Sequence, residues 1–187
     1  YYAPDPSSQI ACSIGGNVAE NAGGVHCLKY GLTVHNVRRV RGVLITGEVA
    51  EFGGDSLDSA GYDLLALITG SEGLLAVITE ITVKLTPKPQ LAQVALAAFA
   101  DVEKAGEAVG AIIAAGIIPA GLEMMDQPAT RAVEQFVHAN YPLDAAAVLL
   151  VESDGTPEEV HAEMAEIGRV LTESGATEIR VSKDEAQ

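Results

Sequence analysis

The sequence predicts an α+β fold in two parts that differ in character. Residues 91–187 alternate regularly between apolar strands and amphipathic helices, whereas residues 1–90 are richer in glycine and in irregular segments. Proline interrupts both helices and sheets, so the Pro-Lys-Pro sequence at residues 87–89 marks the predicted boundary. We therefore expect one domain at residues 1–90 and a second at residues 91–187.

The second part has the pattern of two βαβ units joined by a helix. Asp101 is the predicted N-cap of its first helix, which ends near Gly116. A capping box at residues 156–159 starts the last helix, which ends at Gly175. The four strands are expected at residues 91–99, 120–125, 146–152 and 177–181.

The middle helix of the second part, residues 128–139, is expected to turn three apolar side chains inward: Val133, Phe136 and Val137. Two βαβ units commonly form a four-stranded antiparallel sheet with helices on one face, the ferredoxin-like arrangement. This architecture hosts many functions, so it does not identify an activity by itself.

The first part predicts a hairpin, a short helix and a long strand. The hairpin is expected from residues 40–45 and 48–52, and the helix from residues 62–68. Residues 77–85 alternate, which predicts a strand with these side chains on one face: Val77, Thr79, Ile81, Val83 and Leu85. A last helix is expected to begin at Ser182, and its start so close to the end of the sequence indicates a fragment.

The net charge of −15 is unevenly distributed. Residues 1–90 hold nine acidic and six basic residues, whereas residues 91–187 hold seventeen and five. Such acidity argues against nucleic acid as a partner. The local basic run of Arg38, Arg39 and Arg41 suits an anionic ligand, although a solvated edge is the favoured interpretation.

No apolar run reaches about 18 residues, so the sequence predicts no membrane span. It has no secretory signal, and a cytoplasmic location is expected. Cys12 and Cys27 are then expected to be free thiols. No Cys/His cluster has the spacing of a metal site, so no metal is predicted.

Residues 7–24 form a glycine-rich stretch with two glycine pairs, Gly15-Gly16 and Gly23-Gly24. Glycine permits positive φ and lets a ligand approach the backbone closely. A glycine pair that opens a short helix also leaves free N–H groups, which suit an anion such as phosphate. A turn between two elements is an equally good interpretation, because the stretch is neither GxGxxG nor a Walker loop.

Five motifs follow one another in the first part: PDPSS, CSIGGNVAENAGG, HCLKYG, GYDL and GSEG. This ordered set resembles the flavoprotein family of vanillyl-alcohol oxidase and p-cresol methylhydroxylase. Within that family the chain closely resembles the FAD-linked D subunits of bacterial glycolate oxidases and the D-lactate dehydrogenases. The resemblance extends over essentially the whole chain, since LEMMDQPA at residues 122–129 also matches.

The resemblance implies that FAD binds between two subdomains, of which residues 1–90 are the second. Residues 7–13 would lie along the flavin and its ribityl-pyrophosphate, residues 15–23 would line the same cofactor, and residues 72–78 would meet the adenosine end. Residues 91–187 would begin the substrate-facing cap domain. The implied FAD-binding residues are Ser7, Ser8, Ser13, Gly15, Gly16, Asn17, Glu20, Asn21, Gly23, Glu72, Gly73, Ala76 and Ile78.

The family's first subdomain and the rest of its cap have no counterpart in these residues, and many relatives have glycine where Ala76 stands. The catalytic residues are therefore unknown, and the truncated chain alone is expected to be inactive. His26 and His35 lie near the glycine-rich stretch, but loop histidines more often satisfy backbone groups. Tyr30 is expected to pack rather than to contact the cofactor.

The implied activity is oxidation of a 2-hydroxy acid, of the glycolate or D-lactate class, to the 2-oxo acid by hydride transfer to flavin. Partner subunits or an electron acceptor are expected, with any membrane association made through such subunits. The alternative is a non-catalytic domain that binds a small molecule or serves assembly in a multisubunit oxidoreductase.

Overall fold

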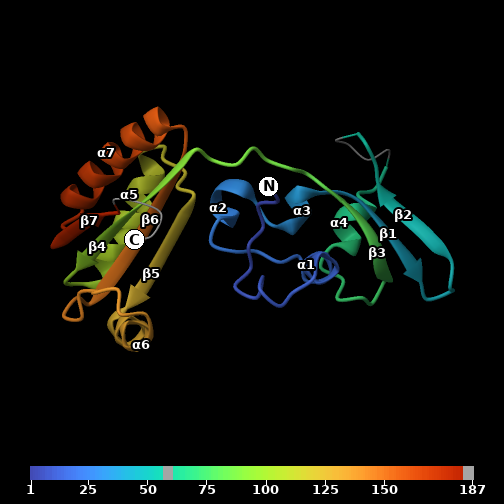
Figure 1. The fold of residues 1–187 in the computed structure, drawn as a ribbon, viewed down its shortest axis with the longest axis horizontal. Helices are drawn as coiled ribbons and strands as arrows, with labels where there is room; N and C mark the ends of the chain where they lie inside the picture. Colours follow the sequence, from blue (N-terminus) through green and yellow to red (C-terminus); the bar gives the residue numbers. More distant parts are fainter. Residues whose placement is uncertain (57–60, 183–187) are drawn as a thin grey trace. The chain divides into compact units, whose positions relative to one another are not determined.

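The computed structural model describes residues 1–56 and 61–182 of the chain, so the helix predicted to begin at Ser182 lies essentially outside the described residues. The chain divides into two compact units, Tyr1–Lys88 and Pro89–Gln187 (Figure 1). The division falls inside the Pro-Lys-Pro segment. Each unit is described by itself below.

The first unit contains an antiparallel sheet of strand order β2-β1-β3. Its strands and helices are α1 Ile14–Glu20, α2 Cys27–Tyr30, α3 Thr33–Asn36, β1 Val37–Leu44, β2 Val49–Gly53, α4 Leu64–Ile68 and β3 Ala76–Val83. The predicted hairpin is present as β1 and β2, with Gly47 at positive φ in its turn. The buried core joins the sheet to α1 and α4 through Val18, Val37, Val40, Ile68 and Ala76.

The prediction that Val77, Thr79, Ile81, Val83 and Leu85 share one face of β3 is wrong in its first half. Val77, which should begin that face, is 66% exposed, and Thr79 is exposed as well. Ala76 is buried instead, and Ile78 packs against the same core. Leu85 lies beyond the end of the strand and is also exposed.

A β-bulge explains this difference. Arg41 of β1 pairs with Glu80, but the next residue, Gly42, pairs with Ile78, so β3 carries one extra residue at this point. An extra residue shifts the alternation by one and moves the following side chains to the other face. Ile78 before the bulge and Ile81 after it therefore pack against one core.

The second unit contains a four-stranded sheet of order β5-β6-β4-β7, in which all neighbours are antiparallel. Its elements are β4 Leu91–Phe99, α5 Val102–Ala114, β5 Gly121–Asp126, α6 Gln127–Val137, β6 Ala147–Gly155, α7 Pro157–Glu173 and β7 Glu178–Val181. The predicted Asp101 cap and the capping box at Thr156 and Glu159 are both confirmed.

Helices α5 and α7 cover one face of this sheet. The register pairs Leu149 with Ala97 and Ala147 with Phe99, and these side chains are buried with Ile112 of α5 and others in the main core. A smaller cluster lies on the other face and is formed by Ala98, Ala145 and Val148, with Leu96, Met125, Tyr141 and Leu150 packed against them. Because side chains alternate along β4 and β6, the two strands contribute buried residues to both faces of the sheet.

The predicted inward face of α6 is wrong. Phe136 is 88% exposed, Val137 is also exposed, and Val133 is only half-buried. The residue that α6 buries is Thr130, whose hydroxyl donates to the Asp126 carbonyl. Spacing of three and four residues shows that apolar side chains share a helix face, but it does not show that another element covers that face.

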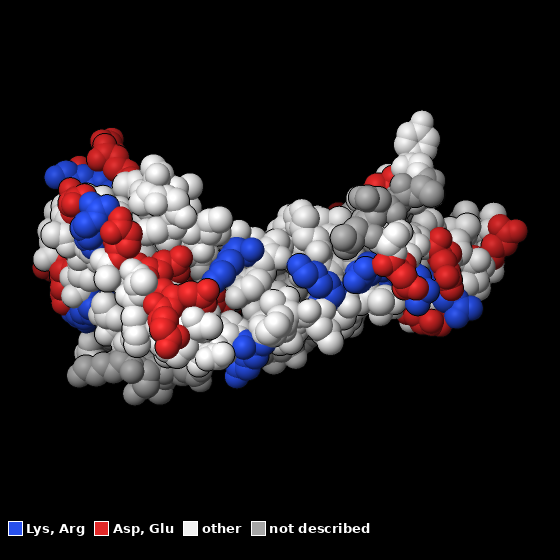
Figure 2. Space-filling model, turned by 90° about the horizontal axis from the view of Figure 1, so that it is seen from above, with Lys and Arg blue, Asp and Glu red and all other residues white. Residues whose placement is uncertain are grey.

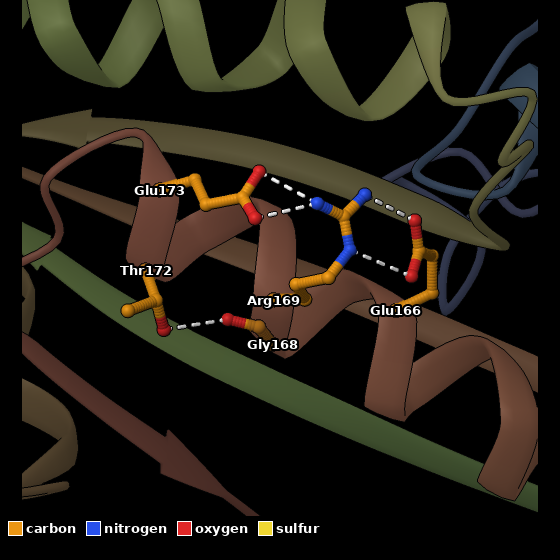
Figure 3. A network of polar contacts seen from close by, with 5 residues as sticks. All are labelled: Glu166, Gly168, Arg169, Thr172 and Glu173. Atoms are coloured by element: carbon orange, nitrogen blue, oxygen red, sulfur yellow. Dashed lines mark hydrogen bonds and ion pairs between the residues drawn. The ribbon is translucent and has the colours of Figure 1, made fainter.

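The surface of α7 carries an ion-pair network (Figure 3). Arg169 forms two hydrogen bonds to the carboxylate of Glu166 and two to that of Glu173, at 2.5–3.0 Å. The hydrogen bonds from Arg169 lower the pKa of Glu166, and those from the two carboxylates raise the pKa of Arg169. Exposed pairs of this kind contribute little to stability, so the network indicates a solvated helix face.

Acidic side chains outnumber basic ones in the sequence, and on the face drawn in Figure 2 both kinds are scattered among other residues, which form most of it. Within the described residues, no helix is both long and apolar enough to cross a membrane.

The turn that follows α6 is held by a carboxylate. Glu134 accepts hydrogen bonds from the backbone N–H groups of Ala139, Asn140 and Tyr141 at 2.9–3.1 Å. Desolvation alone would raise the pKa of Glu134, but these three donors, with His138 nearby, outweigh it and lower the pKa.

Two phenylalanines of the second unit provide a matched test of its core. Phe99→Ala removes a fully buried side chain and should lower the free energy of unfolding by roughly 3–5 kcal/mol. Phe136→Ala removes an exposed one and should change it by less than about 0.5 kcal/mol. Urea unfolding measures both values. Equal losses would contradict the assignment of Phe136 to the surface.

The Glu134 carboxylate should titrate below its usual range. Because its folded-state pKa is lowered, its stabilising contribution is present above the unfolded pKa of about 4.3 and is lost as pH falls through the folded value. NMR titration of the side chain should show the low pKa directly, and Glu134→Gln should reduce the acid-induced loss of amide protection at Ala139 and Asn140. An ordinary glutamate pKa would disprove the proposed anchoring role.

Candidate cofactor-binding site

Helix α1 begins at the centre of the glycine-rich stretch. Ser13 is its N-cap in an extended conformation, and the Ser13 hydroxyl accepts a hydrogen bond from Gly16 N at 3.0 Å. Within the described residues, the N–H groups of Ile14 and Gly15 have no such capping partner. Asn17 is 5% exposed, and its Oδ1 accepts a hydrogen bond from the Cys12 thiol at 3.2 Å.

The first glycine pair is helical, so positive φ is not what these positions require. Gly15 and Gly16 form the first turn of α1 and are absent from the left-handed region. A Cβ at Gly16 would meet only the Ser13 hydroxyl, at 3.4 Å, and a Cβ at Gly15 would meet the same atom at 3.8 Å. The helix surface beside both glycines is therefore open to a ligand.

The second glycine pair serves internal packing. A Cβ at Gly24 would lie 2.1 Å from Asp5 Oδ1 and 2.6 Å from the Asp5 carbonyl oxygen. A Cβ at Gly23 would lie 3.1 Å from the side chain of Leu32. Within this unit, the neighbours of the second pair are protein atoms, in contrast to the open surface beside the first pair.

The structure brings two distant stretches of predicted site residues together. The turn at residues 70–73 lies against the C-terminal end of α1, where Gly70 N donates to Val18 O at 2.8 Å and Glu72 N donates to Ala19 O at 2.9 Å. Glu72 has φ 53° and Gly73 has φ 77°, so both are in the left-handed region. Residues 13–21 and 70–73 therefore form one continuous surface.

Ser71 is a candidate that the sequence prediction missed. Its hydroxyl is buried and has no hydrogen-bond partner among the described residues. Buried polar groups are nearly always paired, so an unpaired hydroxyl directly before the predicted site residue Glu72 suits a polar ligand. The signal was available in the GSEG motif, where Ser71 directly precedes Glu72.

Three other predicted site residues, Asn21, Ala76 and Ile78, are held by contacts within the first unit. Asn21 ends α1 at φ 49°, and its Oδ1 accepts a hydrogen bond from Val34 N at 3.0 Å. Ala76 is buried in the core, and Ile78 packs against it. The Ala76 methyl group faces Gly42 of the neighbouring strand, where a Cβ would lie only 3.1 Å away. A contact between a cofactor and Ala76 or Ile78 would thus involve mainly the backbone of these residues, whereas the Val77 side chain is exposed.

The remaining predicted positions precede α1 or follow it. Ser7 and Ser8 lie in an exposed turn with Ile10, which is 98% exposed. Glu20 is exposed at the last position of α1. Together with the α1 surface and the turn at residues 70–73, these side chains form an accessible surface that combines polar groups with the exposed Ile10 and Ile14.

The two histidines near the glycine-rich stretch contact protein groups. His35 lies in α3 rather than in a loop, but its Nδ1 accepts a hydrogen bond from a backbone group, Leu32 N, at 3.1 Å, as predicted. His26 Nδ1 lies 2.6 Å from Asp5 Oδ2. Tyr30 packs edge-to-face on Tyr1, with ring centres 6.0 Å apart, in agreement with its predicted packing role.

The basic run lies along β1. Arg41 pairs with Glu80 at 2.7 Å, and Arg38 donates to the Asp55 carbonyl at 2.7 Å. The expected solvated edge is wrong, because β1 is the middle strand of the sheet; the run lies on its solvent-accessible face, where Arg41 pairs with a neighbouring strand. Cys12 and Cys27 are free thiols, and no group of three or more potential metal ligands is found in residues 1–56 and 61–182.

Two family models match the chain. The model of the C-terminal domain of FAD-linked oxidases matches residues 88–187, and an FAD-binding domain model matches residues 1–53. Both matches agree with the predicted flavoprotein resemblance.

Several relatives match along the chain. It is 62% identical over its whole length to glycolate oxidase subunit GlcD of Escherichia coli K12, of which it covers 38%. It is 42% identical to the subunit of the same name from Bacillus subtilis 168, covering 40% of that protein. A D-lactate dehydrogenase of Anaerostipes hadrus is 36% identical over 97% of the chain, which covers 40% of that enzyme. The chain thus spans about two fifths of these relatives.

Solved structures share the fold. Alkyldihydroxyacetonephosphate synthase superposes with a TM-score of 0.82 over all of the chain and 37% of that protein, at 22% identity. p-Cresol methylhydroxylase superposes with a TM-score of 0.72 over 93% of the chain and 40% of that protein, at 18% identity. With the family model that matches residues 88–187, these findings show that the chain belongs to the family of FAD-linked oxidases.

Proposed function

We propose that this chain is part of an FAD-dependent oxidoreductase that oxidises a 2-hydroxy acid of the glycolate or D-lactate class to the 2-oxo acid. The observation that carries this proposal is the 62% identity, over the whole chain, to a glycolate oxidase subunit. The D-lactate dehydrogenase at 36% identity supports the wider substrate class. Both relatives act on small acids with a hydroxyl beside the carboxylate, so the shared chemistry defines the class.

In this proposal, residues 1–90 are the second subdomain of an FAD-binding domain, and residues 91–187 are a ferredoxin-like part of the cap. The strand order β5-β6-β4-β7, with α5 and α7 on one face, supports the second assignment. The FAD-binding model over residues 1–53 supports the first.

The residues of the first unit fit a phosphate-bearing cofactor. The α1 surface at Gly15 and Gly16 is open, two N–H groups of its first turn are uncapped, and Ser71 offers an unpaired hydroxyl. FAD, when bound, supplies the hydride acceptor for the oxidation. The protein residues then bind and orient it: residues 13–17 with Glu72 and Gly73 hold its polar parts, and Ser7 and Ser8 lie along the flavin.

The proposal extends to partners. A relative that is named as a subunit supports further subunits or a separate electron acceptor. Such subunits would also account for any attachment of a cytoplasmic enzyme to a membrane. The alternative, a domain that only binds a small molecule or serves assembly, predicts no substrate-dependent change in a bound flavin.

Flavin reduction tests the activity. A full-length protein that contains this chain should purify yellow, and anaerobic glycolate or D-lactate should bleach its visible flavin band. Acetate and propionate are matched controls, because they lack the hydroxyl that is oxidised. A bound flavin that none of these acids reduces would favour the binding or assembly role, and a colourless protein that takes up no FAD would contradict the proposal.

Gly16→Ala tests the open surface of α1. Its helical backbone should make alanine stabilising to the FAD-free protein by about 0.5–1 kcal/mol, reduced by the close Ser13 hydroxyl. The same methyl group should weaken FAD binding about tenfold if the cofactor approaches this backbone. Calorimetric titration and thermal melting measure the two effects.

Gly110→Ala is the control for this substitution. Gly110 lies in α5 with open space beside it, so alanine should stabilise that helix without changing FAD affinity. Unchanged FAD affinity in Gly16→Ala would rule out close approach of the cofactor at this position.

A further inference from the structure

Within the described residues, positions 7–11 of the exposed loop at residues 7–12 make no side-chain hydrogen bond. All of its side chains are exposed, and its hydrogen bonds are local: Ala11 N and Cys12 N both donate to Ser8 O at 2.9 Å. A loop without buried contacts takes its position from the residues at its two ends. The proposed function assigns this loop to the flavin, so these end contacts matter for cofactor binding.

The rear end of the loop, which is its C-terminal end, is hydrogen-bonded to α1. The Cys12 thiol donates to Asn17 Oδ1 at 3.2 Å, and the Ser13 hydroxyl accepts from Gly16 N at 3.0 Å. Asn17 is buried, so this end is fixed to a rigid part of the unit.

The front end of the loop, which is its N-terminal end, is held by Asp5. Its Oδ2 lies 2.6 Å from His26 Nδ1, and its Oδ1 accepts from His26 N at 3.4 Å. An ionised carboxylate only accepts hydrogen bonds, so His26 Nδ1 carries the proton of this contact. The backbone and carboxylate of Asp5 also lie so close to Gly24 that no Cβ fits there. Asp5 is therefore held on two sides.

We propose that Asp5 and His26 are positioning residues for the cofactor: the pair fixes the front end of the loop at residues 7–12 so that its serines lie along the flavin. This inference rests on the proposed function. The side chains of Asp5 and His26 are 21% and 30% exposed, and a charge-assisted hydrogen bond in this setting is stronger and more directional than an exposed one. In this role each residue acts through the loop, by fixing its position.

Four substitutions in the full-length protein test the pair. Asp5→Asn and His26→Ala remove the charge-assisted contact from either side. His26→Asn is the conservative variant, because an asparagine amide can donate from near the Nδ1 position. Glu80→Gln is the matched control, since it breaks the 2.7 Å ion pair with Arg41 on the sheet of the same unit.

The measurements are FAD affinity by calorimetry, the visible circular dichroism of the bound flavin, and thermal melting of the FAD-free protein. Asp5→Asn and His26→Ala should weaken FAD binding about tenfold and alter the dichroism, while melting changes no more than in the control. His26→Asn should restore most of the affinity. Glu80→Gln should bind FAD as the unsubstituted protein does.

Two results would overturn the proposal. One is FAD affinity and dichroism in Asp5→Asn and His26→Ala equal to those of Glu80→Gln. The other is a fall in melting temperature, well beyond that of the control, that accompanies every loss of affinity, because it would reveal a purely structural pair. An unsubstituted protein that binds no FAD would instead overturn the proposed function, so the two failures are distinguishable.

Discussion

Two backbone hydrogen bonds link the turn at residues 70–73 to the end of α1, and the proposed site depends on them. Gly70 N and Glu72 N donate to carbonyl groups of Val18 and Ala19, which lie at the C-terminal end of the helix. Val18 O also accepts a hydrogen bond from the C-cap Asn21 N at 3.3 Å. The last carbonyl groups of a helix lack regular intrahelical partners. The turn supplies these partners only because its residues adopt left-handed conformations, at Gly70, Glu72 and Gly73. The same contacts place two stretches of the sequence, some fifty residues apart, on one surface.

Local signals predicted much of the second unit. The strand expected at residues 91–99 is β4, and the capping box at Thr156 and Glu159 starts α7, because both patterns involve neighbouring residues only. The inward face of β3 and that of α6 were mistaken for a different reason. The bulge opposite Arg41 and Gly42 arises from pairing with β1, and the exposure of Phe136 depends on what lies beside α6. Neither is encoded in the local spacing.

At the candidate site too, local sequence patterns did not reveal which other parts of the fold contact a residue. The ordered motifs predicted the cofactor stretches, but they did not distinguish the two glycine pairs. Gly16 is helical with open space beside it, whereas Gly24 is pressed against Asp5, which lies nineteen residues earlier in the chain. Ser71 lies within a recognised motif, yet only its burial without a partner makes it a candidate. Residue type suggests a role for a glycine or a serine, and its neighbours in the fold decide between the possibilities.

The two units differ in whether the contacts that stabilise the fold also shape the proposed cofactor surface. In the second unit, a broad, mainly aliphatic core beneath α5 and α7 stabilises the sheet. The ion pairs of Arg169 lie on the exposed surface of α7 and are separate from that core. The first unit has a much smaller buried cluster, so its caps, left-handed turns and the Asp5–His26 pair provide a larger share of its order. These are also the contacts that shape the proposed cofactor surface. Substitutions there should therefore be small and individually controlled, because a large change alters the fold and the site together.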